Sequence, residues 1–179
     1  MSHSAEPSPP PNVVPVSALF GDLEDEFAGT RRMLERYPDD QDPTWAPHER
    51  SMGLLALAAH VASLPEFARV IAAQAEWNAA DQPYVPPAAS NRDELLALFD
   101  EKAEAARHAI ASLDAAAMED PWRMRNGDIV YFEGRRGALL RRFLISHTAH
   151  HRGQLSVYYR MLGVSVPGLY GPSADERRG

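Results

Sequence analysis

Hydrophobic residues recur at intervals of three and four along four stretches of the chain, which is the spacing of one face of an α-helix. The first stretch runs from Ser17, a suitable N-terminal cap, to Tyr37, and Pro38 ends it. The second begins near Ser51 and continues as MGLLALAAHVASLPEFARVIAA. Its first half has few polar residues and should be largely buried, and Pro65 should kink or interrupt it.

The third stretch follows residues 77–89, which contain three prolines and are predicted to be a loop. Ser90 with Asp93, or Asn91 with Glu94, fits a capping box that starts a helix. The apolar positions of this helix are Leu95, Leu96, Phe99, Ala103, Ala106, Ile110 and Leu113.

The last helix is expected from Gly137 to Leu162, with Gly163 as its natural C-terminal stop. Before it, Asn126-Gly127 is a tight-turn signal between short apolar runs, which indicates a loop or a small hairpin. The tail VSVPGLYGPSADERRG has no periodicity and is predicted to be irregular.

Four helices with short links predict an all-α fold, an antiparallel four-helix bundle with an irregular C-terminal tail. The bundle domain is expected over residues 16–179. Five of the first 15 residues are proline, so residues 1–15 are expected to be a disordered or extended arm. This segment has neither the basic start nor the apolar run of a signal peptide.

Composition narrows the function classes. The formal net charge of -7 argues against nucleic-acid binding, and no apolar run reaches the length of a membrane span. The chain has no cysteine, which excludes thiolate metal sites and disulfides and is compatible with the cytoplasmic location that we expect. A local basic cluster is interpreted as a solvated helix end; its members are Arg135, Arg136, Arg141 and Arg142.

Three histidines fall within five residues, HTAHH, in the last predicted helix. Residues four apart lie on one helix face, so His147 and His151 can point at one spot, but His147 and His150 are also within reach of each other. Spacing alone does not choose between these pairs. The apolar stripe of the helix runs along His147 and His151, which favours that pair, because buried imidazoles are costly unless paired or ligated.

His60 is the best candidate for a third ligand, because it lies in the middle of the apolar run LLALAAHVASL. The simpler alternative is a hydrogen-bonded core histidine, and His48 and His108 have the context of ordinary surface residues. No HExxH motif is present, so a zincin-type protease site is excluded.

The segment HTAHHRGQLSVYYRMLGVSVPGLYGPSADE resembles the C-terminal signature of the DinB-like, or YfiT-like, metal-dependent hydrolase superfamily. Two further segments match the layout of its first and second helices, EDEFAGTRRMLERYPDD and WAPHERSMGLLALAAHVASLPEF. The resemblance covers the chain from about Ser17 to Glu176.

The resemblance implies an up-down-down-up four-helix bundle and places the metal ligands of the family on His60, His147 and His151. It also implies a divalent metal ion, with zinc or nickel expected, and a homodimer. Members of the family include thiol S-transferases that use bacillithiol or mycothiol, and a mycothiol-dependent isomerase. A low-molecular-weight thiol is therefore an expected cosubstrate.

No acid or base stands beside the expected ligands in sequence; Ser63 occupies the turn after His60, and Glu66 follows Pro65. We expect a metal-dependent enzyme that acts on a small molecule, with thiol S-transfer ranked ahead of hydrolysis. The alternative is a non-catalytic protein, a metal-stabilised helical scaffold or a stress-response binding protein. A structural site would be closed by a fourth protein ligand, whereas a catalytic one keeps an open position.

Overall fold

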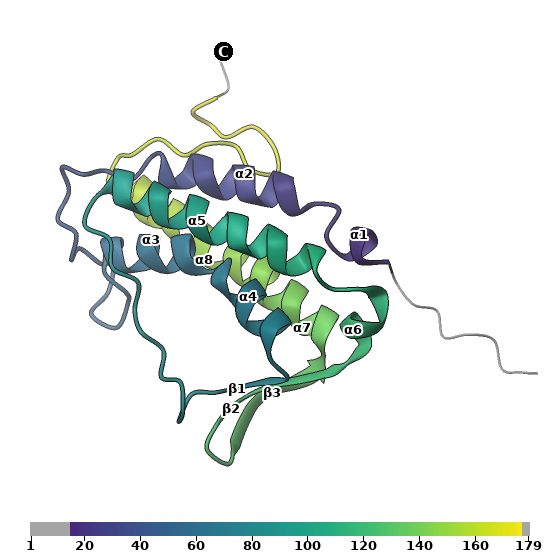
Figure 1. The fold of residues 1–179 in the computed structure, drawn as a ribbon. Coiled ribbons are helices and arrows are strands. Elements are labelled where there is room, and N and C mark those ends of the chain that lie inside the picture. Colours follow the sequence, from purple (N-terminus) through teal and green to yellow (C-terminus); the bar gives the residue numbers. More distant parts are fainter. Residues whose placement is uncertain (1–14, 177–179) are drawn as a thin grey trace, which may run out of the picture.

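The computed structural model describes residues 15–176. The predicted N-terminal arm therefore lies, except for Pro15, outside the described residues. The helices and strands follow one another along the chain (Figure 1) as α1 Val16–Leu19, α2 Leu23–Leu34, α3 Leu54–Ser63, α4 Glu66–Ala73, β1 Glu76–Asn78, α5 Arg92–Ala111, α6 Ala115–Glu119, β2 Pro121–Asn126, β3 Ile129–Arg135, α7 Arg136–Arg141, the π-helical turn η1 Arg142–Ser146, and α8 His147–Met161.

Local sequence signals place several helix ends. Pro65 separates α3 from α4, and the two axes are bent by 43°. The predicted capping box opens α5: the Asn91 side chain accepts from the Glu94 N–H at 2.9 Å, and Glu94 accepts from the Ser90 N–H at 2.8 Å. The first predicted helix is instead divided into α1 and α2, with Phe20–Asp22 between them.

A three-stranded mixed sheet lies at one end of the helices, next to α4, α6 and α7 (Figure 1). Strands β2 and β3 form an antiparallel hairpin whose turn contains Gly127 at a φ of +57°, in agreement with the predicted tight turn. Strand β1 pairs in parallel with β2, so that Trp77 lies opposite Met124. Glu76 accepts from the guanidinium groups of Arg123 and Arg125, which fixes this pairing from the side chains as well.

The prediction of an all-α four-helix bundle is therefore wrong, because the protein combines helices with a β-sheet. The error has two physical sources. Residues 77–89 were predicted to be a loop, yet β1 occupies Glu76–Asn78, a strand too short to show alternation. Its partner, β2, lies 47 residues further along the chain, so no local pattern announces the pairing.

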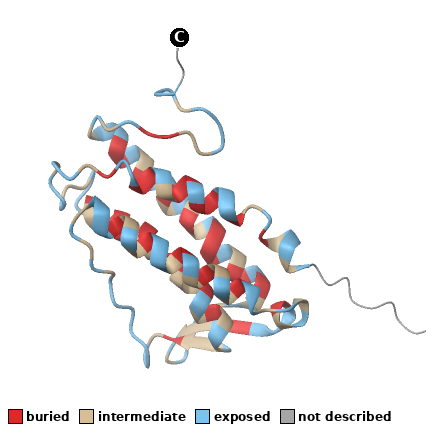
Figure 2. Ribbon diagram, turned by 45° about the horizontal axis from the view of Figure 1, so that its top comes forward, coloured by how far each residue is buried: buried red, intermediate tan, exposed pale blue. Residues whose placement is uncertain are grey.

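The buried residues gather on the inward faces of α2, α3, α5 and α8 (Figure 2). Phe27 of α2 meets Phe99 of α5 edge to face, with ring centroids 5.8 Å apart, and α3 contributes Leu54, Leu57 and Ala58 to the same core. Among the described residues, no single helix has the length and apolarity to cross a membrane. The bent pair α3 and α4 passes that test only when the two are taken together.

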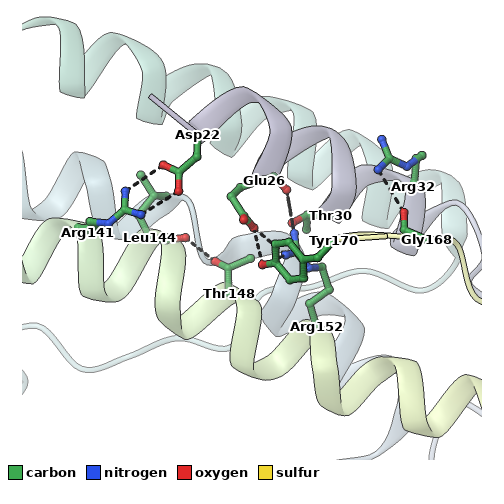
Figure 3. A network of polar contacts seen from close by, with 10 residues as sticks. All are labelled: Asp22, Glu26, Thr30, Arg32, Arg141, Leu144, Thr148, Arg152, Gly168 and Tyr170. Atoms are coloured by element: carbon green, nitrogen blue, oxygen red, sulfur yellow. Dashed lines mark hydrogen bonds and ion pairs between the residues drawn. The ribbon is translucent and has the colours of Figure 1, made fainter. Parts of the chain in front are cut away.

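A buried ion pair joins α2 to α8 (Figure 3). Arg152 is 1% exposed, and its Nη2 donates to Oε2 of Glu26 at 2.6 Å. Its Nη1 donates to the Glu26 carbonyl and to Oγ1 of Thr30, each at 2.9 Å. Tyr170 of the C-terminal tail completes the network, because its hydroxyl accepts from Arg152 and donates to Glu26. The network thus fixes the positions of α2, α8 and the tail relative to one another.

We predict that Glu26→Ala lowers the free energy of unfolding by about 3–5 kcal/mol, because it leaves the Arg152 guanidinium buried without its counter-charge. The matched control is Glu24→Ala on the same helix, which removes an exposed ion pair with Arg107 and should cost at most about 1 kcal/mol. Urea unfolding monitored by circular dichroism measures both changes. Equal losses of unfolding free energy in the two variants would show that the buried ion pair contributes no more to stability than the exposed one.

Candidate metal centre

Three histidines from two helices surround one point beside the core. His60 comes from the middle of α3, and His147 and His151 come from the first two turns of α8. Each offers one ring nitrogen, and these nitrogens all lie within 4.8 Å of one another. The Nε2 atoms of His147 and His151 are 2.8 Å apart, and all three residues are half-buried. The structure therefore brings together the three residues singled out in the sequence.

The other ring nitrogens face away from this point, and two of them have partners. His151 Nδ1 is 2.7 Å from Oε1 of Gln154, and His60 Nδ1 is 3.3 Å from the hydroxyl of Tyr84. The Nδ1 atom of His147 is buried without a hydrogen-bond partner in the described structure. A partner that accepts a proton from Nδ1, as Oε1 of Gln154 does for His151, leaves the lone pair of Nε2 free, which is the usual arrangement around metal-binding histidines.

Burial, and to a smaller extent the neighbouring His151, lowers the pKa of His60 to about 4. Burial likewise is the main cause that lowers the pKa of His147 to about 4, followed by the charges of the adjacent histidines. Burial also lowers the pKa of His151, against the opposing effect of its hydrogen bond with Gln154. All three imidazoles are therefore neutral at pH 7, the form in which histidine binds a metal ion.

A cavity of about 420 Å³ opens beside the cluster and has His147 in its wall. Phe67, Phe132 and Phe143 make most of this wall apolar, and Arg142 and Ser146 are polar positions at its side. A second cavity of about 510 Å³ shares Phe67 with the first and includes Tyr84, the partner of His60. Both cavities have a size that suits small molecules.

Within the described residues, no carboxylate and no fourth histidine belongs to the cluster. Glu66, which follows Pro65, lines the larger cavity and is held in ion pairs with Arg69 and Lys102. Ser63 donates to the carbonyl of His60 at 2.9 Å rather than acting as a ligand.

The other histidines among residues 15–176 lie outside the cluster. His150 is exposed on α8, as its place at the edge of the apolar stripe predicted, although its ring packs against that of His151. His48 is exposed in a loop, and His108 is exposed on α5, where it pairs with Glu104.

The donor set fits a divalent metal ion. Three neutral imidazole nitrogens from facing helices are a ligand type suited to zinc, nickel and related ions. They leave at least one coordination position for water or substrate, because no fourth protein ligand stands among the described residues of the group. The fold and the site together define a helical protein with a three-histidine group fit for metal binding.

The chain belongs to the DinB family, whose family model matches residues 16–178. Two solved structures have the same fold. A DinB-like protein from Bacillus cereus ATCC 10987 superposes with a TM-score of 0.65 at 18% identity, over 88% of this chain and 99% of that one. A DinB-like protein from Bacillus subtilis superposes with a TM-score of 0.62 at 20% identity, over 89% of this chain and 99% of that one.

A shorter match comes from the uncharacterized protein YrdA of Bacillus subtilis (strain 168). It is 55% identical over 40 residues, which cover 22% of this chain and 23% of YrdA. The matched segment thus spans about a quarter of that relative.

Sequence reasoning missed three residues at the site. Gln154 had a usable signal, because it follows His151 by three residues and therefore lies one helical turn away. Tyr84 lies in the proline-rich loop after β1, where no periodicity predicts which side chain turns inward. Arg142 was grouped with a solvated basic cluster, although it lines the cavity beside His147.

We predict that His151→Gln sharply lowers the metal content of the purified protein, because the substitution removes one imidazole ligand. The matched control is His150→Gln on the same helix, which should leave the metal content unchanged, because that side chain is exposed outside the cluster. Elemental analysis of protein purified without a histidine tag gives the stoichiometry, and circular dichroism checks the helices. Equal metal loss in both variants would place the ligands elsewhere on α8.

Proposed function

We propose that the protein is a metal-dependent enzyme that transfers a small electrophilic group to the sulfur of a low-molecular-weight thiol. One observation carries the proposal: the three-histidine group has no fourth ligand among the described residues, and it opens at His147 onto a cavity of about 420 Å³. A site that only stabilises the fold is closed by protein ligands, whereas a catalytic site keeps a position for its substrate.

A divalent ion held by three neutral imidazoles keeps its full charge and lowers the pKa of a thiol or a water molecule that binds it. Side chains of the protein orient the ligands and shape the cavity. Gln154 holds His151 in the ligand tautomer, the Tyr84 hydroxyl contacts Nδ1 of His60, and burial keeps the imidazoles neutral. The phenylalanines at the cavity wall exclude water from the reacting end of the substrate.

The surroundings of the cluster favour S-transfer over hydrolysis. Attack by water proceeds best with a general base within hydrogen-bond reach. The nearby carboxylate, Glu66, is already paired with Arg69 and Lys102 and belongs to the other cavity. A thiolate is a strong nucleophile without such a base. In the proposed reaction the sulfur–carbon bond forms, the bond to the leaving group breaks, and the thiol proton passes to solvent.

The test uses the full chain loaded with zinc or nickel, monochlorobimane as the electrophile, and cysteine, bacillithiol and mycothiol as thiols. The sulfur displaces chloride, and fluorescence reports the product. We predict a metal-dependent rate with at least one thiol, and a fall to the uncatalysed rate after chelation or in His151→Gln. The proposal would be contradicted if the protein binds the metal and gains thermal stability but does not accelerate the reaction of any of the three thiols. That result would favour the non-catalytic, metal-stabilised scaffold.

We further propose that the protein is a homodimer, as the resemblance to its family implied. Val157 and Met161 lie one turn apart on α8 and are 54% and 57% exposed. Met52 is 40% exposed, and its carbonyl accepts from Tyr158 of the same helix, so a third apolar side chain lies nearby. An apolar surface of this kind suits a two-fold contact between copies.

We predict a solution mass of about twice 19.8 kDa by light scattering at micromolar concentration. The double variant Val157→Glu, Met161→Glu should be monomeric, because it places four like charges across the two-fold contact. Ile129→Glu, which changes an equally exposed apolar residue on β3, should remain dimeric. A wild-type protein that scatters only as a 19.8 kDa species would contradict the dimer.

A further inference from the structure

Four arginines lie close together in sequence around α7, and one of them differs from the others in its surroundings. Three form ion pairs with carboxylates, while Arg142 has no carboxylate partner among the described residues. The pairs are Arg135 with Glu119 at 2.9 Å, Arg136 with Asp120 at 3.7 Å, and Arg141 with Asp22 at 2.8 Å. Ion pairing does not account for the place of Arg142, which is exposed and lines the cavity beside the histidine cluster.

A π-helical turn places Arg142 on this side of the helix. In η1 the N–H of His147 donates to the carbonyl of Arg142, five residues back rather than four. The wider turn changes which side chains share a face, and such turns are frequent at functional sites. As a result, Arg142 and His147 line the same cavity, one at each end of the turn. The guanidinium lies over the ring of Phe132, 4.7 Å from its centroid.

Among the described residues that line this cavity, Arg142 is the only arginine, lysine or carboxylate side chain. The larger cavity differs: its basic residues, Arg69 and Lys102, are both paired with Glu66. The smaller cavity thus presents one uncompensated positive charge above aromatic walls.

We propose that Arg142 binds an anionic group, a carboxylate or a phosphate, of the small molecule that occupies this cavity. The guanidinium fork matches the two oxygens of either group. The anion end would lie at Arg142, the apolar body along the wall that Phe132 and Phe143 form together, and the far end at His147. The placement of that far end as the reacting end rests on the proposed function. The binding of the anion at Arg142 does not.

The experiment measures binding to the metal-loaded full chain by isothermal titration calorimetry. Three probes share an aromatic body and differ in the end group: 3-phenylpropanoate, 2-phenylethylphosphonate and the neutral 3-phenylpropanamide. We predict that at least one anion binds about tenfold or more tightly than the amide. The preferred anion tells a carboxylate site from a phosphate site.

Two variants assign that preference to Arg142. Arg142→Gln should abolish it, and Arg142→Lys should retain part of it, because lysine keeps the charge but loses the bidentate fork. The matched control is Arg135→Gln, which removes a neighbouring arginine that is paired with Glu119 and does not line the cavity. Metal content and thermal unfolding, measured on each variant, confirm that the site and the fold are intact.

Two outcomes would overturn the inference. Equal affinity for anions and amide in the wild type would show that the cavity does not select charge. An anion preference that survives in Arg142→Gln would place the anion on the metal ion, and Arg142 would then serve only to cover Phe132. These outcomes are separate from those of the thiol assay. A protein can catalyse S-transfer without an anion preference, or show the preference and catalyse nothing with the thiols tested.

Discussion

The buried ion pair between Arg152 and Glu26 is the constraint on which the histidine site depends. Arg152 follows His151 directly, and a helix turns by about 100° per residue. When Arg152 is held against α2, the rotation of α8 is fixed, and His147 and His151 are directed toward α3. A rotation of α8 would separate Arg152 from Glu26 and leave its guanidinium buried without a counter-charge. The large desolvation cost of that arrangement makes it much less stable. The ligands are thus oriented by a contact on a different face of their own helix.

The same contact involves a close approach to a glycine on α2 and the folded tail. A Cβ added at Gly29 would lie 3.3 Å from Nη1 of Arg152, so a side chain there would shift the guanidinium by a few tenths of an ångström. Tyr170 reaches the network from the tail, which Asp175 also holds by accepting from the N–H of Val166 at 2.7 Å. Because α2, α8 and the tail meet at one guanidinium, the tail contributes to the geometry of a site that it does not touch.

The sequence predicted those features whose causes are local. Asn91 caps α5, Pro65 divides α3 from α4, and the spacing of His147 and His151 places them one turn apart. It did not predict β1, because that strand exists through a partner 47 residues away. It also did not predict η1, since one extra residue in a helical turn leaves the apolar spacing nearly unchanged. That turn brings Arg142, which is exposed, and His147 to the wall of the same cavity.

Charge balance at the site then limits which ligands fit it. The three imidazoles are neutral, so they compensate none of the charge of a divalent ion. The carboxylate of Glu66 is paired with Arg69 and Lys102, and the smaller cavity adds the positive charge of Arg142. In a half-buried place, uncompensated charge is costly. Under the proposed function, the negative charge that balances a bound ion would come from the ligand, which would favour thiolates and carboxylate- or phosphate-bearing molecules over neutral ones.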